Sequence, residues 1–151
     1  MNAKSRLLLV VLTTMTLRLM EQWRGPLSRV LGDLPDYEMT MIMAAVVSIN
    51  AEKFMRMELE PNWETLAHPL PYHLLTECNL SSIAAATGLN RETVRRKVSK
   101  LVDAGLLIKE DGSVHLRRGL LQRPIARQMI DDQLSALLRA VNQLERFKVL
   151  R

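Results

Sequence analysis

The sequence predicts a mainly α-helical protein with a small β-hairpin, and three observations favour this fold class. The chain has 151 residues, which suits one domain with helical extensions, and 48% of them are apolar, as in a globular protein. Aromatic residues make up only 4%, whereas nine methionines are present, so the core consists mainly of residues that favour helices. Apolar residues also recur at helical spacing over long stretches near both ends of the chain.

The first long stretch, residues 3–23, is predicted to form a helix that is apolar on nearly every side. A helix of this kind must be buried, and in so small a protein we expect a second subunit to cover it. Gly25-Pro26 is expected to end this helix, and a short helical turn can follow over residues 27–31 before a break at 32–35. The main apolar stripe consists of Leu8, Leu12, Met15, Leu19 and Trp23.

A second helix is expected to begin at Asp36, whose side chain can cap it, and to continue to about Met57 with Glu38 in its first turn. Its methionines can either line an adaptable small-molecule pocket or pack in a core or a dimer, which is the commoner role. Residues 58–71 contain three prolines and no clear period, so we expect a connector there. The methionines in question are Met39, Met41, Met43, Met55 and Met57.

Residues 80–105 carry the clearest helix signals. Ser81 is expected to cap a short helix over 82–87 that ends at Gly88, and Asn90 to cap a longer helix over 91–104 that ends at Gly105. The positions that we expect to face inward are Ile83, Ala84, Leu89, Val94, Val98 and Leu101.

A β-hairpin is predicted directly after the longer helix. Leu106 to Lys109 forms one strand, Asp111-Gly112 is a strong two-residue turn signal, and Val114 to Leu116 forms the returning strand. A helix, a tight turn, a second helix and a hairpin together make a winged helix-turn-helix, with residues 106–118 as its wing.

A last helix is predicted from Pro124 to about Leu150. Its apolar residues alternate steps of four and three, which is the seam of a short coiled coil. We therefore expect an N-terminal helical dimerisation and packing region at 1–71, a winged helix-turn-helix domain at 72–119 and a C-terminal dimerisation helix at 120–151. The seam consists of Ile130, Leu134, Leu137, Val141 and Leu144.

Positive charge is concentrated in the second half of the chain. The net charge is +5, residues 58–79 contain four glutamates and no lysine or arginine, and residues 80–119 contain eight basic and four acidic groups. Such a distribution favours a partner with a phosphate backbone, although a solvated basic face would give the same count.

The longer helix carries the candidate binding face. Positions 91, 92, 95, 96 and 99 lie opposite its apolar side, so they can reach base edges in a DNA major groove together. Arginine suits the acceptor atoms of guanine, and a glutamate can accept a hydrogen bond from cytosine N4. The amides at the start of the shorter helix and the basic residues of the wing can contact phosphates. The predicted DNA-binding residues are Ser81, Ser82, Asn90, Arg91, Glu92, Thr93, Arg95, Arg96, Ser99, Lys100, Lys109, Arg117 and Arg118.

The run Arg91-Glu-Thr-Val-Arg-Arg96 is similar to the recognition helix of the catabolite activator (Crp/Fnr) family of bacterial transcription regulators. This resemblance implies that Arg91, Glu92 and Arg96 read bases. It covers about forty residues, a quarter of the chain, and no β-roll or cyclic-nucleotide pocket pattern precedes it, so cyclic-nucleotide sensing is not implied. The helical flanks resemble the MarR-type arrangement, in which terminal helices dimerise.

We therefore expect a sequence-specific transcriptional regulator that binds double-stranded DNA as a homodimer in the cytoplasm. One alternative is a winged-helix scaffold that binds protein partners through the same basic face, and another is a regulator anchored in a membrane by residues 1–23. The longest uncharged stretch, residues 39–51, is shorter than the roughly 20 residues needed to cross a bilayer, so no membrane span is expected. Whether a small-molecule effector exists is left open.

Catalysis and metal binding find little support. His68, His73 and Cys78 are spaced by five residues, which matches no recognised ligand pattern, and a lone cysteine without a basic neighbour is more often inert than a redox switch. A single cysteine also favours a reducing compartment. The sequence contains no glycine-rich phosphate loop, GxSxG or HExxH motif. We expect no enzyme activity, no cofactor and no metal.

Overall fold

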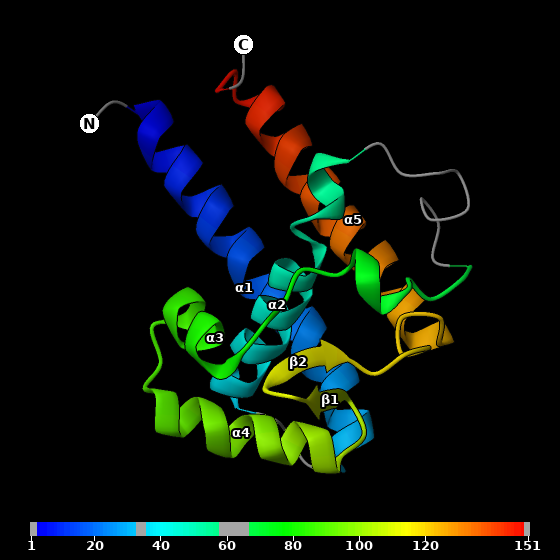
Figure 1. The fold of residues 1–151 in the computed structure, drawn as a ribbon. Coiled ribbons are helices and arrows are strands. Elements are labelled where there is room, and N and C mark those ends of the chain that lie inside the picture. Colours follow the sequence, from blue (N-terminus) through cyan, green and yellow to red (C-terminus); the bar gives the residue numbers. More distant parts are fainter. Residues whose placement is uncertain (1–2, 33–35, 58–66, 150–151) are drawn as a thin grey trace.

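A computed structural model describes residues 3–32, 36–57 and 67–149. Within these residues the chain is mainly helical and has a small two-stranded antiparallel sheet (Figure 1), which confirms the predicted fold class at this level. The α-helices are α1 (Ala3–Leu31), α2 (Tyr37–Ala51), α3 (Leu80–Thr87), α4 (Arg91–Asp103) and α5 (Pro124–Arg146). The strands are β1 (Leu107–Glu110) and β2 (Ser113–Leu116), and the 3₁₀ helices are η1 (Phe54–Arg56) and η3 (Tyr72–Leu74).

The first and last helices, α1 and α5, lie side by side and antiparallel, so both ends of the chain are at the same end of the molecule (Figure 1). α5 places Ala140 against α1, and a small side chain lets two helices approach closely. Val11 of α1 is buried together with Ala140 and Leu144 of α5. Leu144 therefore packs within its own chain, whereas the sequence predicted it to lie in the seam of a dimer.

The structure corrects the predicted end of the first helix. α1 continues through Gly25-Pro26 to Leu31, although a proline inside a helix removes one backbone hydrogen bond. The next residue, Leu27, is buried in the main core, so its packing holds the following turn in helical form. The helix ends where the sequence predicted a break, at Gly32, whose φ of +68° is the left-handed conformation that favours glycine.

The second helix begins as predicted but ends earlier than expected. The Met39 amide donates a hydrogen bond to Oδ1 of Asp36 (2.8 Å), which confirms Asp36 as the N-cap. α2 ends at Ala51 because the chain around Asn50 is held by residues further along. The Asn50 amide group donates to the Thr76 carbonyl (3.1 Å), and the Thr76 amide donates to the Asn50 carbonyl (3.0 Å). Of the predicted connector at 58–71, residues 58–66 lie outside the described part of the chain.

The main core joins α2 to α3, α4 and the hairpin, with α1 contributing Leu27. The predicted inward positions Val94, Val98, Leu101 and Ile83 are all buried, and Ala84 and Leu89 pack at the edge of the same cluster. Among the methionines, Met39 and Met43 belong to this core, whereas Met41, Met55 and Met57 are exposed. The packing role is therefore correct for the two methionines that are buried.

The predicted hairpin is confirmed to within one residue. Leu107 pairs with Leu116, and Glu110 pairs with Ser113 next to the turn. Asp111 and Gly112 both have positive φ (49° and 79°), which is the backbone that a two-residue type I′ turn requires. The Val114 amide donates to the Cys78 carbonyl (2.7 Å), so the segment before α3 is tied to β2.

Candidate nucleic-acid interface

α4 has one buried face and one exposed face. Asn90 caps its N-terminus, with its side-chain oxygen accepting a hydrogen bond from the Glu92 amide (2.8 Å), as predicted. The buried face consists of Val94, Lys97, Val98 and Leu101. The exposed face carries Arg91, Glu92, Arg95, Arg96, Ser99 and Lys100. The structure thus brings the largest group of predicted site residues together on one helix surface.

Three cations on this face are available to a ligand. Within the described residues, no hydrogen bond or ion pair engages the side chains of Arg91, Arg96 or Lys100. Arg91 lies in the first turn of α4, and Arg96 lies in its N-terminal half. In a helix that enters a major groove, the N-terminal half approaches the bases most closely.

The other charged pair on this face is internally neutralised. Nε of Arg95 donates a hydrogen bond to Oε2 of Glu92 (2.9 Å), and Nη2 of Arg95 donates to Oε1. This hydrogen bonding lowers the pKa of Glu92, so the carboxylate is charged at neutral pH. A carboxylate retains further lone pairs, so Glu92 can accept from a base only while sharing its oxygens with Arg95.

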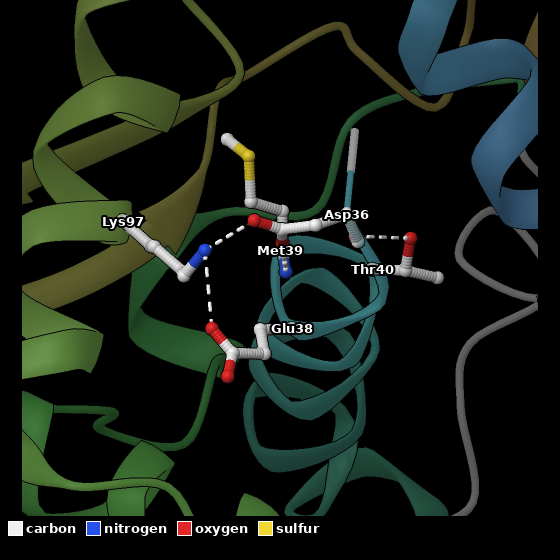
Figure 2. A network of polar contacts seen from close by, with 5 residues as sticks. All are labelled: Asp36, Glu38, Met39, Thr40 and Lys97. Carbon is white, nitrogen blue, oxygen red and sulfur yellow. Dashed lines mark hydrogen bonds and ion pairs between the residues drawn. The ribbon is translucent and has the colours of Figure 1, made fainter. Parts of the chain in front are cut away.

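Lys97 is a feature that the sequence analysis missed. Its side chain is only 11% exposed and donates to Asp36 and Glu38 at the start of α2; the contact with Glu38 measures 3.1 Å (Figure 2). Burial lowers the pKa of Lys97, but the hydrogen bonds to the two carboxylates outweigh it and keep the pKa above its usual value. The spacing 94, 97, 98, 101 placed Lys97 inside the apolar stripe, and this signal could have identified it.

The start of α3 differs from the prediction. Asn79, not Ser81, is the N-cap: its side-chain oxygen accepts from the Ser82 amide (2.9 Å), and the Ser82 hydroxyl accepts from the Asn79 amide (2.9 Å). This reciprocal pair is a capping box. The Ser82 hydroxyl is therefore engaged within the helix end, while Ser81 is exposed. Ser81 and Ser82 remain predicted phosphate contacts, and Ser82 has the less accessible hydroxyl.

The wing carries charges of both signs. Lys109 and Arg118 are exposed, but so are Glu110 and Asp111 at the tip, which reduces the positive potential there. The guanidinium of Arg117 covers the turn after α4. Gly105 in this turn has no side chain, and Nη1 of Arg117 lies 3.1 Å from the point where a Cβ would be. Lys109, Arg117 and Arg118 are all exposed, and Arg117 is the one whose guanidinium lies against the turn after α4.

Three further features of the described residues concern a metal ion, a thiol and a cavity. No group of histidine, cysteine and carboxylate side chains there could hold a metal ion. Cys78 is fully buried, and burial raises the pKa of its thiol, so it is not activated as a nucleophile. An apolar cavity of about 60 Å³ lies between α1, α2, the hairpin and the start of α5, and Met43 is the single member of the predicted methionine set among its described lining residues.

No helix among the described residues is both long enough and apolar enough to cross a membrane. A scan against protein-family models, a search of curated proteins and a search of solved structures each returned no match.

Proposed function

We propose that α2, α3, α4 and the hairpin form a winged helix-turn-helix, and that the protein is a homodimeric transcriptional regulator that reads double-stranded DNA. The observation that carries this proposal is the division of α4 into a fully packed face and an exposed face, on which three cations make no hydrogen bond or ion pair within the described residues. The hairpin follows α4 directly, as a wing does, and the basic charge coincides with the helix that is best placed to enter a groove.

The homodimer is proposed from an apolar stripe on α5. Ile130, Leu134 and Leu137 are between 39% and 51% exposed, and they follow the spacing of a coiled-coil seam beside the face that packs on α1. α1 also exposes Leu9 and Leu12. Contiguous apolar surface of this kind is rare on a monomer, and a repeated seam can pair with its own copy about a two-fold axis.

The test begins with selection of a preferred sequence from a random DNA library by the wild-type protein. Affinities for this site and for unrelated DNA are then measured by fluorescence anisotropy for Arg91→Ala and Arg96→Ala. Each variant is expected to lose about 1–3 kcal/mol on the selected site and to relax the preference at one base position. Arg139→Ala, an exposed arginine on α5, is the matched control and is expected to bind like the wild type.

The wing should behave differently from α4 in the same assay. Lys109→Ala and Arg118→Ala are expected to weaken binding to all sequences about equally and to reduce the slope of log affinity against log salt by about one unit each. The selected site should be a near-palindrome with half-sites about 10 bp apart. If the Arg91 and Arg96 variants stay folded and keep both the motif and the affinity, direct readout is wrong. The basic face would then be a surface that positions the protein on DNA or one that binds protein partners.

A further inference from the structure

We infer that the first turn of α2 is a joint that fixes the orientation of α4 relative to α1, and that Lys97 is the positioning residue of the recognition helix. This inference rests on the proposed function for its effect on DNA binding, but the joint itself is a property of the protein alone. Residues 36, 37 and 38 are consecutive, and each contacts a side chain of α4 or α1.

The α4 side of the joint is a buried cation between two carboxylates. Lys97 is 11% exposed, whereas Asp36 and Glu38 are 52% and 46% exposed, so the ammonium group is enclosed while its partners remain solvated. Figure 2 shows the two carboxylates converging on the same nitrogen atom. Because Lys97 is engaged on the inner side of α4, it cannot contact a phosphate on the outer side.

The α1 side of the joint is held by the residue between these carboxylates. The Tyr37 hydroxyl donates a hydrogen bond to Glu21 (2.7 Å), and the guanidinium of Arg24 lies 4.6 Å from the centre of the Tyr37 ring. Arg24 also pairs with Glu21 (3.2 Å). The first turn of α2 is thus fixed to α1 through Tyr37 and to α4 through Asp36 and Glu38.

Asp36 has a second structural role that makes this turn rigid. One of its oxygens accepts the capping hydrogen bond from the Met39 amide while the other accepts from Lys97 (Figure 2). A rotation of α4 about its axis therefore requires either loss of the Lys97 contacts or movement of a capped helix end. Side-chain tips lie about 5–6 Å from a helix axis, so a rotation of 10° displaces them by about 1 Å, more than a hydrogen bond to a base edge tolerates.

The discriminating experiment compares Lys97→Met with Lys100→Met. Both variants remove one positive charge from α4 and keep a side chain of similar length. Lys97→Met is expected to lower affinity for the selected site about 10-fold or more, because base contacts are misaligned, and to leave affinity for random DNA and the salt slope unchanged. Lys100→Met is expected to lower both affinities by the same factor and to reduce the salt slope by about one unit. Lys97→Arg should restore most of the selectivity.

Asp36→Asn tests the same joint without touching α4. Asparagine is as good an N-cap as aspartate, so the variant keeps α2 capped and removes one carboxylate from Lys97. We expect the same loss of selectivity in a smaller degree, because Glu38 still holds the ammonium group. This variant keeps the inference testable if Lys97→Met does not fold.

A distance measurement separates the joint from the DNA-binding proposal. Spin labels at Arg18→Cys on α1 and Ser99→Cys on α4, in a Cys78→Ser background, report the relative placement of the two helices. The distance distribution is expected to broaden or shift in Lys97→Met and to stay unchanged in Lys100→Met. If the wild type binds no DNA, the proposed function fails, and this distribution still decides the joint. An unchanged distribution in Lys97→Met, or a salt slope that falls as it does in Lys100→Met, overturns the inference.

Discussion

Arg96 and Lys97 are neighbours in the sequence but have opposite environments. A helix places successive residues 100° apart, so Arg96 lies on the exposed face of α4 and Lys97 on the packed face. Arg95 is paired with Glu92 on the same helix. The number of basic residues on α4 therefore overstates the charge available to a ligand, because two of them already have carboxylate partners within the chain.

Asp36 should make a measurable contribution to stability in mild acid. Burial raises its pKa, but hydrogen bonds from Lys97 and the Met39 amide outweigh it, so the pKa in the folded state lies below its usual value. Its stabilising contribution is therefore complete above the unfolded-state pKa of about 3.9 and is lost as the pH falls through the folded-state value. In urea unfolding, the stability difference between wild type and Asp36→Asn should shrink from pH 6 to pH 3.

The exposed Asp131→Asn on α5 serves as the control for that experiment. The difference in unfolding free energy between wild type and Asp131→Asn should not shrink in the same way from pH 6 to pH 3. A wild-type minus Asp36→Asn difference that is constant from pH 6 to pH 3 would contradict the ion pair with Lys97.

At the scale of single elements, local signals predicted α4 and the hairpin well. The Asn90 cap, Gly105 after the helix and the Asp111-Gly112 turn are each encoded within a few residues, and the structure has all three. The predicted first helix is shorter than α1, because the packing of Leu27 overrides the stop signal at Gly25-Pro26.

Long-range contacts explain what the sequence could not reveal. α2 ends early because Asn50 forms hydrogen bonds with Thr76. No local sequence pattern indicates that these two residues are neighbours in the fold. At the candidate site, the exposed face of α4 was predictable from helical spacing. The partners of Lys97 were not, because Asp36 lies 61 residues away along the chain.

The cap of α3 offers a test at this scale. Asn79→Ala removes the side chain that satisfies the Ser82 amide and is expected to lower the free energy of unfolding by about 1 kcal/mol. Ser81→Ala, at the position that the sequence favoured, should change it by less than about 0.5 kcal/mol. Thermal and urea unfolding of both variants measure the difference. Equal effects of the two substitutions would be incompatible with the capping box.

For the molecule as a whole, the uncovered surface of α5 argues for a second copy. The side of α5 that carries Ala140 and Leu144 packs against α1, while Leu134 and Leu137 remain exposed. We expect the protein to sediment as a dimer at micromolar concentration. Leu137→Glu should shift it toward the monomer far more than Arg139→Glu, because only Leu137 lies in the apolar stripe. A wild-type protein that sediments as a monomer would refute this prediction.

The pairing of α1 with α5 also has a consequence for synthesis on the ribosome. Residues 32–123 lie between the two helices, so α1 emerges early and its partner in the packed pair emerges late. At typical translation rates of about 5–20 residues per second, the side of α1 that packs on α5 stays uncovered for on the order of ten seconds, until α5 has been synthesised. During that interval α2, α3, α4 and the hairpin can already form their own core, whose contacts are closer in sequence. Closure of α5 onto α1 then follows, and Val11 stays without its neighbours Ala140 and Leu144 until that step.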